Sequence, residues 1–226
     1  MRHFAGELNE LKEKLLTMAS YAEAAVLSAV QAVTARDYDL ALRVKAEDEI
    51  IDRLELEVDD RAIRLLAKAP LANDLRLVIV ALKLSQNLER VGDEATQIAK
   101  RARNLSQEPP LKLVVDIPGM ADLALQMLKR ALDLFMNYDA ATARGLIPED
   151  KEVDEMNKRI YEELCARMVK DPGSIPRCLQ LMVVAKSLER IADHAKNIVE
   201  EVVFLHEGQD IRHTRKATGL QPAQRP

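Results

Sequence analysis

The chain has 226 residues, enough for one or two domains of ordinary size, and its formal net charge is −4. Hydrophobic residues make up 48% of the sequence, so it can bury a core, but aromatic residues make up only 3% and Trp is absent. Because sheet proteins depend on aromatic and β-branched residues, this composition favours helices. A negative charge without a basic stripe or stacking aromatics also argues against nucleic acid as a partner.

Three features of the sequence predict a cytoplasmic protein that does not insert into a membrane. Uninterrupted apolar stretches such as residues 77–82 are far shorter than the roughly 18 residues that a membrane span requires. Glu7 and Glu10 stand where a signal peptide would need an apolar segment. Cys165 and Cys178 are too few for a disulfide framework or a cysteine zinc site, which fits a reducing compartment.

The predicted helices follow from apolar residues spaced three and four apart. Residues 7–69 contain neither Gly nor Pro, and a turn is expected near residues 36–39 because Asp is a good helix N-cap. A second run follows Pro70, and the strongest break lies at residues 109–119, which hold three Pro and one Gly. Beyond it, Pro148 breaks the start of the predicted fifth helix and residues 172–176 interrupt the chain again. This spacing is typical of long helices packed in a bundle.

The second half of the chain repeats the first. Residues 88–95 read LERVGDEA and residues 188–195 read LERIADHA, and the acidic run at 47–52 returns at 149–154. We therefore predict an all-α fold of two tandem three-helix bundles, six long helices in all, related by an internal repeat. The expected organisation is a first bundle over residues 1–108, a linker over 109–118, a second bundle over 119–207 and a disordered tail over 208–226.

Both repeats hold two corresponding acidic pairs at i,i+4, which places both carboxylates of a pair on one face of a helix. In an antiparallel hairpin, residues equally far from the turn lie level. In the first repeat, Asp52 and Glu89 are equally far from Pro70 to within one residue, and so are Asp48 and Asp93. In the second repeat, Asp154 and Glu189 are equally far from Pro172 to within one residue, and so are Asp150 and Asp193. Four carboxylates per repeat should therefore face one another across a groove. The eight residues are Asp48, Asp52, Glu89, Asp93, Asp150, Asp154, Glu189 and Asp193.

Like charges at this spacing cost roughly 0.2–0.5 kcal/mol per pair, so a fold that faces such pairs twice is most simply explained by bound cations. Oxygen ligands suit Mg²⁺ or Mn²⁺, and carboxylate-rich sites also take iron; we expect one of Mg, Mn, Fe or Zn without distinguishing them. The alternative is solvated acids paired with Arg53, Arg90, Lys186 or Arg190. His194 follows Asp193 and is a possible further iron ligand, although a locally bonded histidine is the simpler interpretation.

The stretch PLANDLR at residues 70–76, with the LERVGD and LERIADHAKNI segments, resembles the PhoU family of phosphate-signalling proteins. The resemblance covers about residues 5–207 and is carried by the doubled (E/D)xxxD motif. It implies two three-helix bundles and metal ions or clusters on the eight acids. It also implies a cytoplasmic negative regulator of phosphate-starvation genes that works with the ATPase of the phosphate ABC transporter and with a sensor histidine kinase. The expected assembly is a homodimer.

Two other functions remain open on the residues themselves. A di-iron carboxylate enzyme or ferritin-like protein also uses acids inside a helical bundle, but it needs Glu-x-x-His ligation, and the residues three before His194, His206 and His213 are not Glu. A helical scaffold without metal is the third possibility. We expect no enzymatic activity, since no nucleophile–base pair or phosphate-cradling Gly loop is present. Phosphate itself should not bind the acidic grooves without a metal as a bridge.

Overall fold

The computed structural model describes residues 2–68, 72–111 and 115–212, and in these ranges it contains helices and no strand. The first three helices are α1 (Arg2–Ala35), α2 (Tyr38–Leu66) and α3 (Ala72–Ser106), and the second half holds α4 (Ile117–Met136), α5 (Ala140–Leu146), α6 (Asp150–Lys170) and α7 (Ile175–Glu207). Short 3₁₀ turns lie at Ile147–Glu149 and Pro172–Ser174. The all-α prediction is confirmed.

Two of the predicted helix boundaries have clear local causes. Arg36 adopts a left-handed backbone with φ 57°, and the side chain of Asp37 accepts a hydrogen bond from the Leu40 amide at 2.8 Å, which ends α1 and begins α2. The predicted turn at residues 36–39 is therefore correct. Pro148 lies in the 3₁₀ turn between α5 and α6, because a prolyl nitrogen cannot donate the hydrogen bond that a continuous helix needs there. The expected fifth helix is accordingly a short α5 followed by α6.

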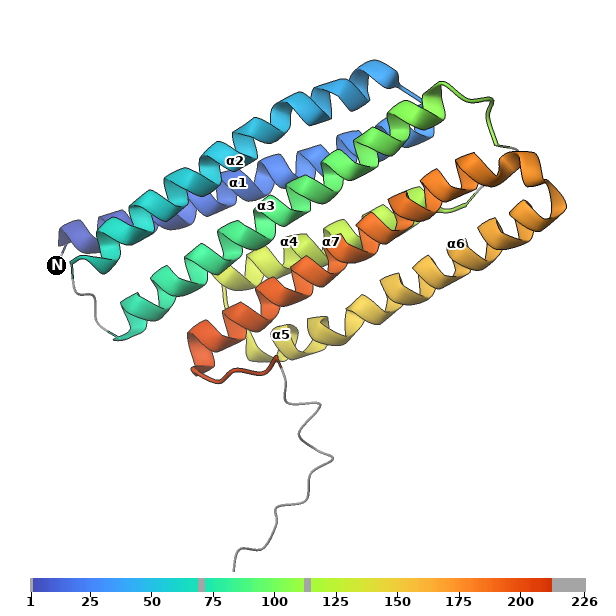
Figure 1. Ribbon diagram of the computed structural model, residues 1–226. Helices are drawn as coiled ribbons and strands as arrows, with labels where there is room; N and C mark the ends of the chain where they lie inside the picture. The colour runs from blue at the N-terminus through green and yellow to red at the C-terminus, as the bar shows by residue number, and fades with distance from the viewer. Residues whose placement is uncertain (1, 69–71, 112–114, 213–226) are drawn as a thin grey trace, which may run out of the picture.

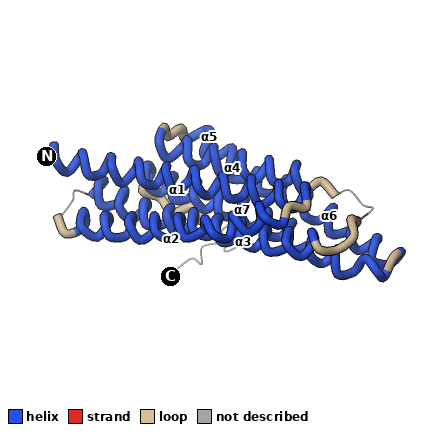
Figure 2. Tube along the Cα trace, turned by 90° about the horizontal axis from the view of Figure 1, so that it is seen from above, coloured by secondary structure: helices blue, strands red, loops and turns tan. Residues whose placement is uncertain are grey.

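The helices form two bundles that lie side by side along their length (Figure 1). Helices α1, α2 and α3 pack together, α4 and α6 pack on α7, and the two groups meet where α3 lies along α7 and α1 along α4. Seen from above, the tube is elongated and most of its loops lie toward its ends (Figure 2). The helices' apolar stripes merge into one continuous core of buried Leu, Val, Ile, Ala and Met side chains.

Polar contacts fix the direction of α3 against α7. Lys83 forms an ion pair with Glu201 at 2.8 Å, the Arg190 guanidinium donates to Glu94 at 3.1 Å, and Arg101 donates to Gln180 at 3.3 Å. From pair to pair the residue number rises on α3 and falls on α7, so the two helices are antiparallel. The two repeats therefore contact each other through the third helix of each, α3 and α7.

By length and composition alone, the segment Phe4–Ala35 of α1 could cross a membrane, which differs from the expectation drawn from uninterrupted apolar runs. Its mean hydropathy is raised by many Ala residues spread over several turns. The segment packs along α2, α3 and α4, and 44% of its most apolar window is buried. These contacts are those of a core helix in a bundle.

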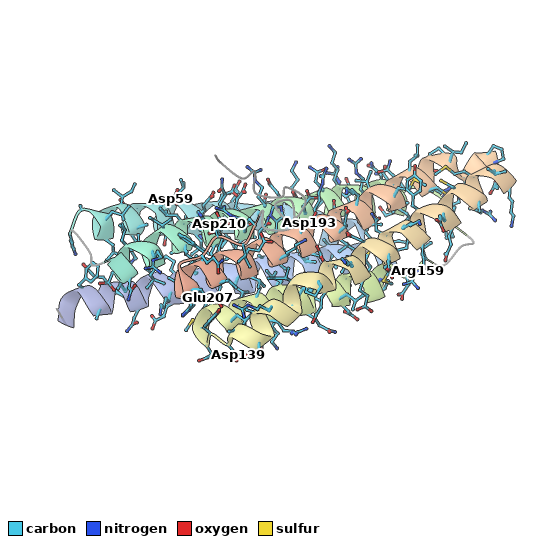
Figure 3. The ribbon with its side chains drawn as sticks, turned by 90° about the horizontal axis from the view of Figure 1, so that it is seen from below. Asp59, Asp139, Arg159, Asp193, Glu207 and Asp210 are labelled. Atoms are coloured by element: carbon cyan, nitrogen blue, oxygen red, sulfur yellow. The ribbon has the colours of Figure 1, made fainter. Side chains whose placement is uncertain are left out.

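The end of α7 is tied to the rest of the second bundle. Gly208 takes the left-handed conformation that caps the helix, with φ 69°. Tyr138 donates a hydrogen bond to Glu207 at 2.6 Å and stacks on His206, and Figure 3 shows Glu207 and Asp139 near the same end of the second bundle. Arg212 forms an ion pair with the buried Glu201 at 3.0 Å. Residues 208–212 of the expected tail therefore contact the fold, and residues 213–226 lie outside the described part of the chain.

Candidate functional site

The first groove is formed by Asp48 and Asp52 on α2 and by Glu89 and Asp93 on α3. The two helices approach closely here because α3 carries Gly92: a Cβ atom at this glycine would lie 2.8 Å from Ile51 Cδ1 and 3.3 Å from Asp48 Oδ1. The Asp48 carboxylate thus lies against α3, as the hairpin geometry predicts. The absence of a side chain at position 92 leaves space for the Ile51 side chain and for this carboxylate.

The acids of the first groove raise one another's pKa values. Burial, with Asp52 and Asp93 nearby, raises the pKa of Asp48 to about 6. Burial and the neighbouring Asp93 raise the pKa of Glu89 to about 7, although Arg90 opposes the shift. Arg90 lies 3.4 Å from Glu89 and 3.0 Å from Asp93 and is, among the described residues, the cation that pairs with this set. The first groove therefore keeps an excess of negative charge.

The second groove is formed by Asp150 and Asp154 on α6 and by Glu189 and Asp193 on α7, the last labelled in Figure 3. Burial raises the pKa of both Asp154 and Asp193, and the second largest contribution comes from a neighbouring acid, Asp150 and Glu189 respectively. The predicted four acids are again brought together.

Two lysines distinguish this groove from the first. Lys196 forms an ion pair with Asp150, which is buried, and Lys186 forms one with Glu189. At the matching positions of the first repeat stand Thr96 and Gln86, which carry no charge. Of the cations expected to pair with these acids, Lys186 and Arg90 do so. Lys196 is not among the expected partners, and Arg190 pairs with Glu94 instead.

The carboxylates suit a metal ion by their chemistry but are not arranged around one. In the part of the chain that the structure describes, no group of three or more His, Cys, Asp or Glu side chains is placed to hold a metal ion. The grooves bring the acids close enough to shift one another's pKa, and carboxylate oxygens are what Mg²⁺ and Mn²⁺ prefer. Binding a cation would require these side chains to adopt other positions, so the eight-residue metal site stays a prediction.

The His194 side chain contacts the first bundle. Its Nδ1 is 3.0 Å from Asn87 Oδ1 on α3, and burial lowers its pKa. Of the charged groups near it, Glu94 raises that pKa, while Arg90 and Arg190 lower it. This histidine thus belongs to the contact between the bundles, in agreement with the simpler interpretation of it as a locally bonded residue.

Two acids on α2 that sequence reasoning missed, Glu55 and Asp59, extend the first groove. Glu55 is half-buried, and its pKa is raised first by burial and then by Asp59 and Asp52. Both missed residues follow Asp52 on α2 at helical spacing, three and seven residues later. The two residues are themselves an i,i+4 acid pair, which is the signal that the sequence carries, but the second repeat has Asn157 and Tyr161 at the corresponding positions.

Comparison with known proteins gives the same assignment to both halves. The PhoU domain matches residues 15–102 and again residues 117–202. The chain belongs to the PhoU family. It is 40% identical over 214 residues to the "phosphate-specific transport system accessory protein PhoU homolog" of Pseudomonas putida, covering 94% of this chain and 84% of that protein. It is 35% identical to the accessory protein PhoU of Escherichia coli, over 93% of this chain and 88% of that protein.

Solved structures of the PhoU family share the fold. The crystal structure of PhoU from Pseudomonas aeruginosa superposes with a TM-score of 0.87 at 38% identity, covering 91% of this chain and all of that one. The PhoU regulatory protein of Streptococcus pneumoniae gives 0.86 at 29% identity, over 92% of this chain and 99% of that one. The predicted family and the repeated bundle fold are thereby confirmed. The relatives carry the names of accessory and regulatory proteins of phosphate transport and not of enzymes.

Proposed function

We propose that this PhoU protein is a cytoplasmic negative regulator of phosphate uptake and of phosphate-starvation signalling. It acts by contact with the ATPase of the phosphate ABC transporter and with a sensor histidine kinase, as a homodimer and without catalysis of its own. The observation that carries the proposal is the match of both repeats to the PhoU domain, together with relatives named as accessory proteins of the phosphate-specific transport system.

We also propose that divalent or iron ions bind between the acids of each repeat. Support comes from the raised pKa values of Asp48 and Glu89, which report carboxylates held close to one another in a partly desolvated place. A bound cation would remove this repulsion. The first groove should bind more tightly, because in the second groove Lys186 and Lys196 already neutralise two carboxylates.

The enzymatic alternative gains no support from the described residues. A di-iron site needs histidine beside the acids, but His194 pairs with Asn87 and His206 stacks on Tyr138. The metal-free scaffold remains the alternative that metal measurements decide.

The regulator proposal is tested by recovering the protein's partners from cells. The tagged full-length chain is purified from cultures grown in high and in low phosphate, and its partners are identified by mass spectrometry. We expect the transporter ATPase or the histidine kinase in at least one condition, and their absence from both would contradict the proposal. Analytical ultracentrifugation tests the homodimer, since a protein that sediments as a monomer at every concentration would exclude it.

A further inference from the structure

The groove between α2 and α3 continues beyond the acids into a basic end. A pocket of about 430 Å³ is lined by Asp48 and Asp52 at one end and by three cations toward the other. The cations are Lys45 from α2 and Lys100 and Arg103 from α3, and they define what we call the basic end of the first groove.

The register of the hairpin places these cations together. The Arg103 guanidinium lies 5.4 Å from the centre of the Tyr38 ring at the start of α2, which sets residues of the two helices level at this point. One turn closer to the acids, Ala41 stands on α2 opposite Lys100 and is fully buried. Because its side chain is a single methyl group, the space between the helices stays open beside the lysine.

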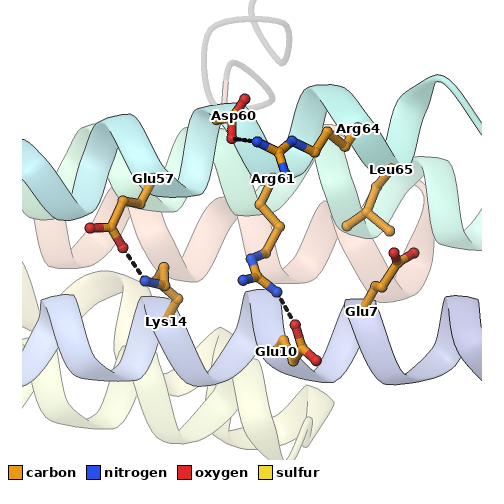
Figure 4. A pocket seen from close by; sticks show the side chains of 8 residues that line it. All are labelled: Glu7, Glu10, Lys14, Glu57, Asp60, Arg61, Arg64 and Leu65. Atoms are coloured by element: carbon orange, nitrogen blue, oxygen red, sulfur yellow. Dashed lines mark hydrogen bonds and ion pairs between the residues drawn. The ribbon is translucent and has the colours of Figure 1, made fainter.

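The fold does not neutralise the three cations. In the described residues none of them takes part in an ion pair, and although Arg103 lies over the Tyr38 ring, its buried Nε has no hydrogen-bond partner. The pocket between α1 and α2 is different, as Figure 4 shows: there Lys14 pairs with Glu57, Arg61 with Glu10 and Arg64 with Asp60. Surface cations in this chain can therefore find partners, whereas the basic end leaves three of them facing a shared space.

The repeat shows that packing does not require these charges. The residues 100 positions after Lys100 and Arg103 are Glu200 and Val203, an acid and a buried apolar residue in the same helical positions of α7. The third helix of a PhoU bundle can thus be built without either cation. Their presence in the first repeat alone points to a ligand that only this groove receives.

We propose that the basic end binds the phosphate group of a small anion through Lys45, Lys100 and Arg103. An arginine fork matches two phosphate oxygens, and lysines supply point charges at either side. Carboxylates in the same pocket, Glu49 among them, accept hydrogen bonds but donate none when ionised. They therefore favour monohydrogen phosphate, which carries a hydroxyl group, over sulfate, which does not. A cation on Asp48 would strengthen binding but is not required.

This inference deepens the proposed function, and its meaning as a phosphate signal rests on that function. It also revises the expectation that phosphate needs a metal bridge, because the cations now supply the countercharge. The proposed regulatory function and the proposed phosphate site can be disproved independently of each other. A protein that binds phosphate but contacts neither the transporter nor the kinase would lose the proposed function and keep this site, and the reverse result would remove only the site.

The test is calorimetric titration of the metal-free, full-length protein with inorganic phosphate, sulfate and ATP. The variant Lys45→Gln/Lys100→Gln removes two cations of the site and leaves the Arg103–Tyr38 contact, and Lys158→Gln, an exposed lysine on α6, is the matched control. We expect phosphate or ATP to bind, phosphate at least about tenfold more tightly than sulfate, with a loss of about tenfold or more in the double variant only.

The outcomes separate the possible ligands. Binding of phosphate assigns the site to the free anion, and binding of ATP alone assigns it to the phosphate groups of a nucleotide. The proposal is overturned if neither phosphate nor ATP binds at millimolar concentration, if phosphate and sulfate both bind and do so equally tightly, or if the double variant binds as the wild type does. Circular dichroism melting confirms that the variants are folded before they are compared.

Discussion

Lys196 on α7 forms an ion pair with Asp150 at the start of α6, and the equivalent position of the first repeat holds Thr96. The two grooves therefore share their acids but not their countercharges. This difference suggests that the two halves of the PhoU fold have diverged in what they bind.

Exchanging the second-groove lysines for their repeat counterparts should create a stronger cation site. In Lys186→Gln/Lys196→Thr the four acids lose two partners, so the metal-free protein should melt at a lower temperature than the wild type. Added Mg²⁺ or Mn²⁺ should then stabilise the variant more than it stabilises the wild type, because the metal no longer displaces a lysine. Differential scanning calorimetry with and without metal measures both effects. An equal metal response in the two proteins would remove the second groove as a metal site.

Removing charge from the first groove should abolish its metal response. In Glu89→Gln/Asp93→Asn the metal-free protein should be as stable as the wild type or more so, because like-charge repulsion is lost. A metal at 100 times its dissociation constant for a groove stabilises the protein by about 2.7 kcal/mol through that groove, and the variant should lose the contribution of the first groove. Glu162→Gln/Glu163→Gln, two exposed acids on α6, is the control and should keep the full response. Equal destabilisation of the groove variant with and without metal would identify the acids as ordinary ion-pair partners.

The metal-free protein should become less stable as pH rises from about 4 to 8. Asp48 and Glu89 have pKa values raised to about 6 and about 7, so the folded state binds more protons than the unfolded state in this window. Their favourable contribution is complete below their unfolded pKa values and is lost as pH passes through the folded ones. After solvent screening we expect about 1 kcal/mol, or roughly 2–4 °C in melting temperature for a domain of this size.

The measurement is the melting temperature in EDTA across this pH range, for the wild type and for Asp48→Asn/Glu89→Gln. The difference between the two proteins gives the contribution of these two carboxyl groups. The variant should show a flatter pH dependence than the wild type. Superimposable curves would mean that the two acids titrate as they do in the unfolded chain.

The segment after α7 should stabilise the fold as far as Arg212. Glu201 is 5% exposed and is held by Lys83 and Arg212, so a chain ending at Glu207 loses one of the two cations that face a buried carboxylate. We expect it to be less stable than a chain ending at Arg212 by about 1 kcal/mol. Chemical denaturation compares the two, with Arg212→Ala in the full-length chain as the control. Identical unfolding midpoints would show that residues 208–212 add nothing, as the sequence alone suggested.

The elements that sequence reasoning predicted are those with local or periodic causes. The helices, the turn at Asp37 and the level placement of Asp48 beside α3 follow from apolar spacing, capping and hairpin geometry. The side-by-side contact of α3 with α7 could not be predicted in this way, because the ion pair of Lys83 with Glu201 joins residues from different repeats. The ion pair of Lys196 with Asp150 likewise depends on the direction of a long side chain, which sequence periodicity does not specify.

The most direct test of the regulator proposal is expression of phosphate-starvation genes in a strain from which this gene has been deleted. We predict that the genes stay on in phosphate-rich medium and that the full-length chain supplied in trans switches them off. A deletion strain with normal repression would contradict the account. Oxidation of Fe²⁺ with O₂ at catalytic rates by the purified protein, without restored repression, would favour the di-iron alternative instead.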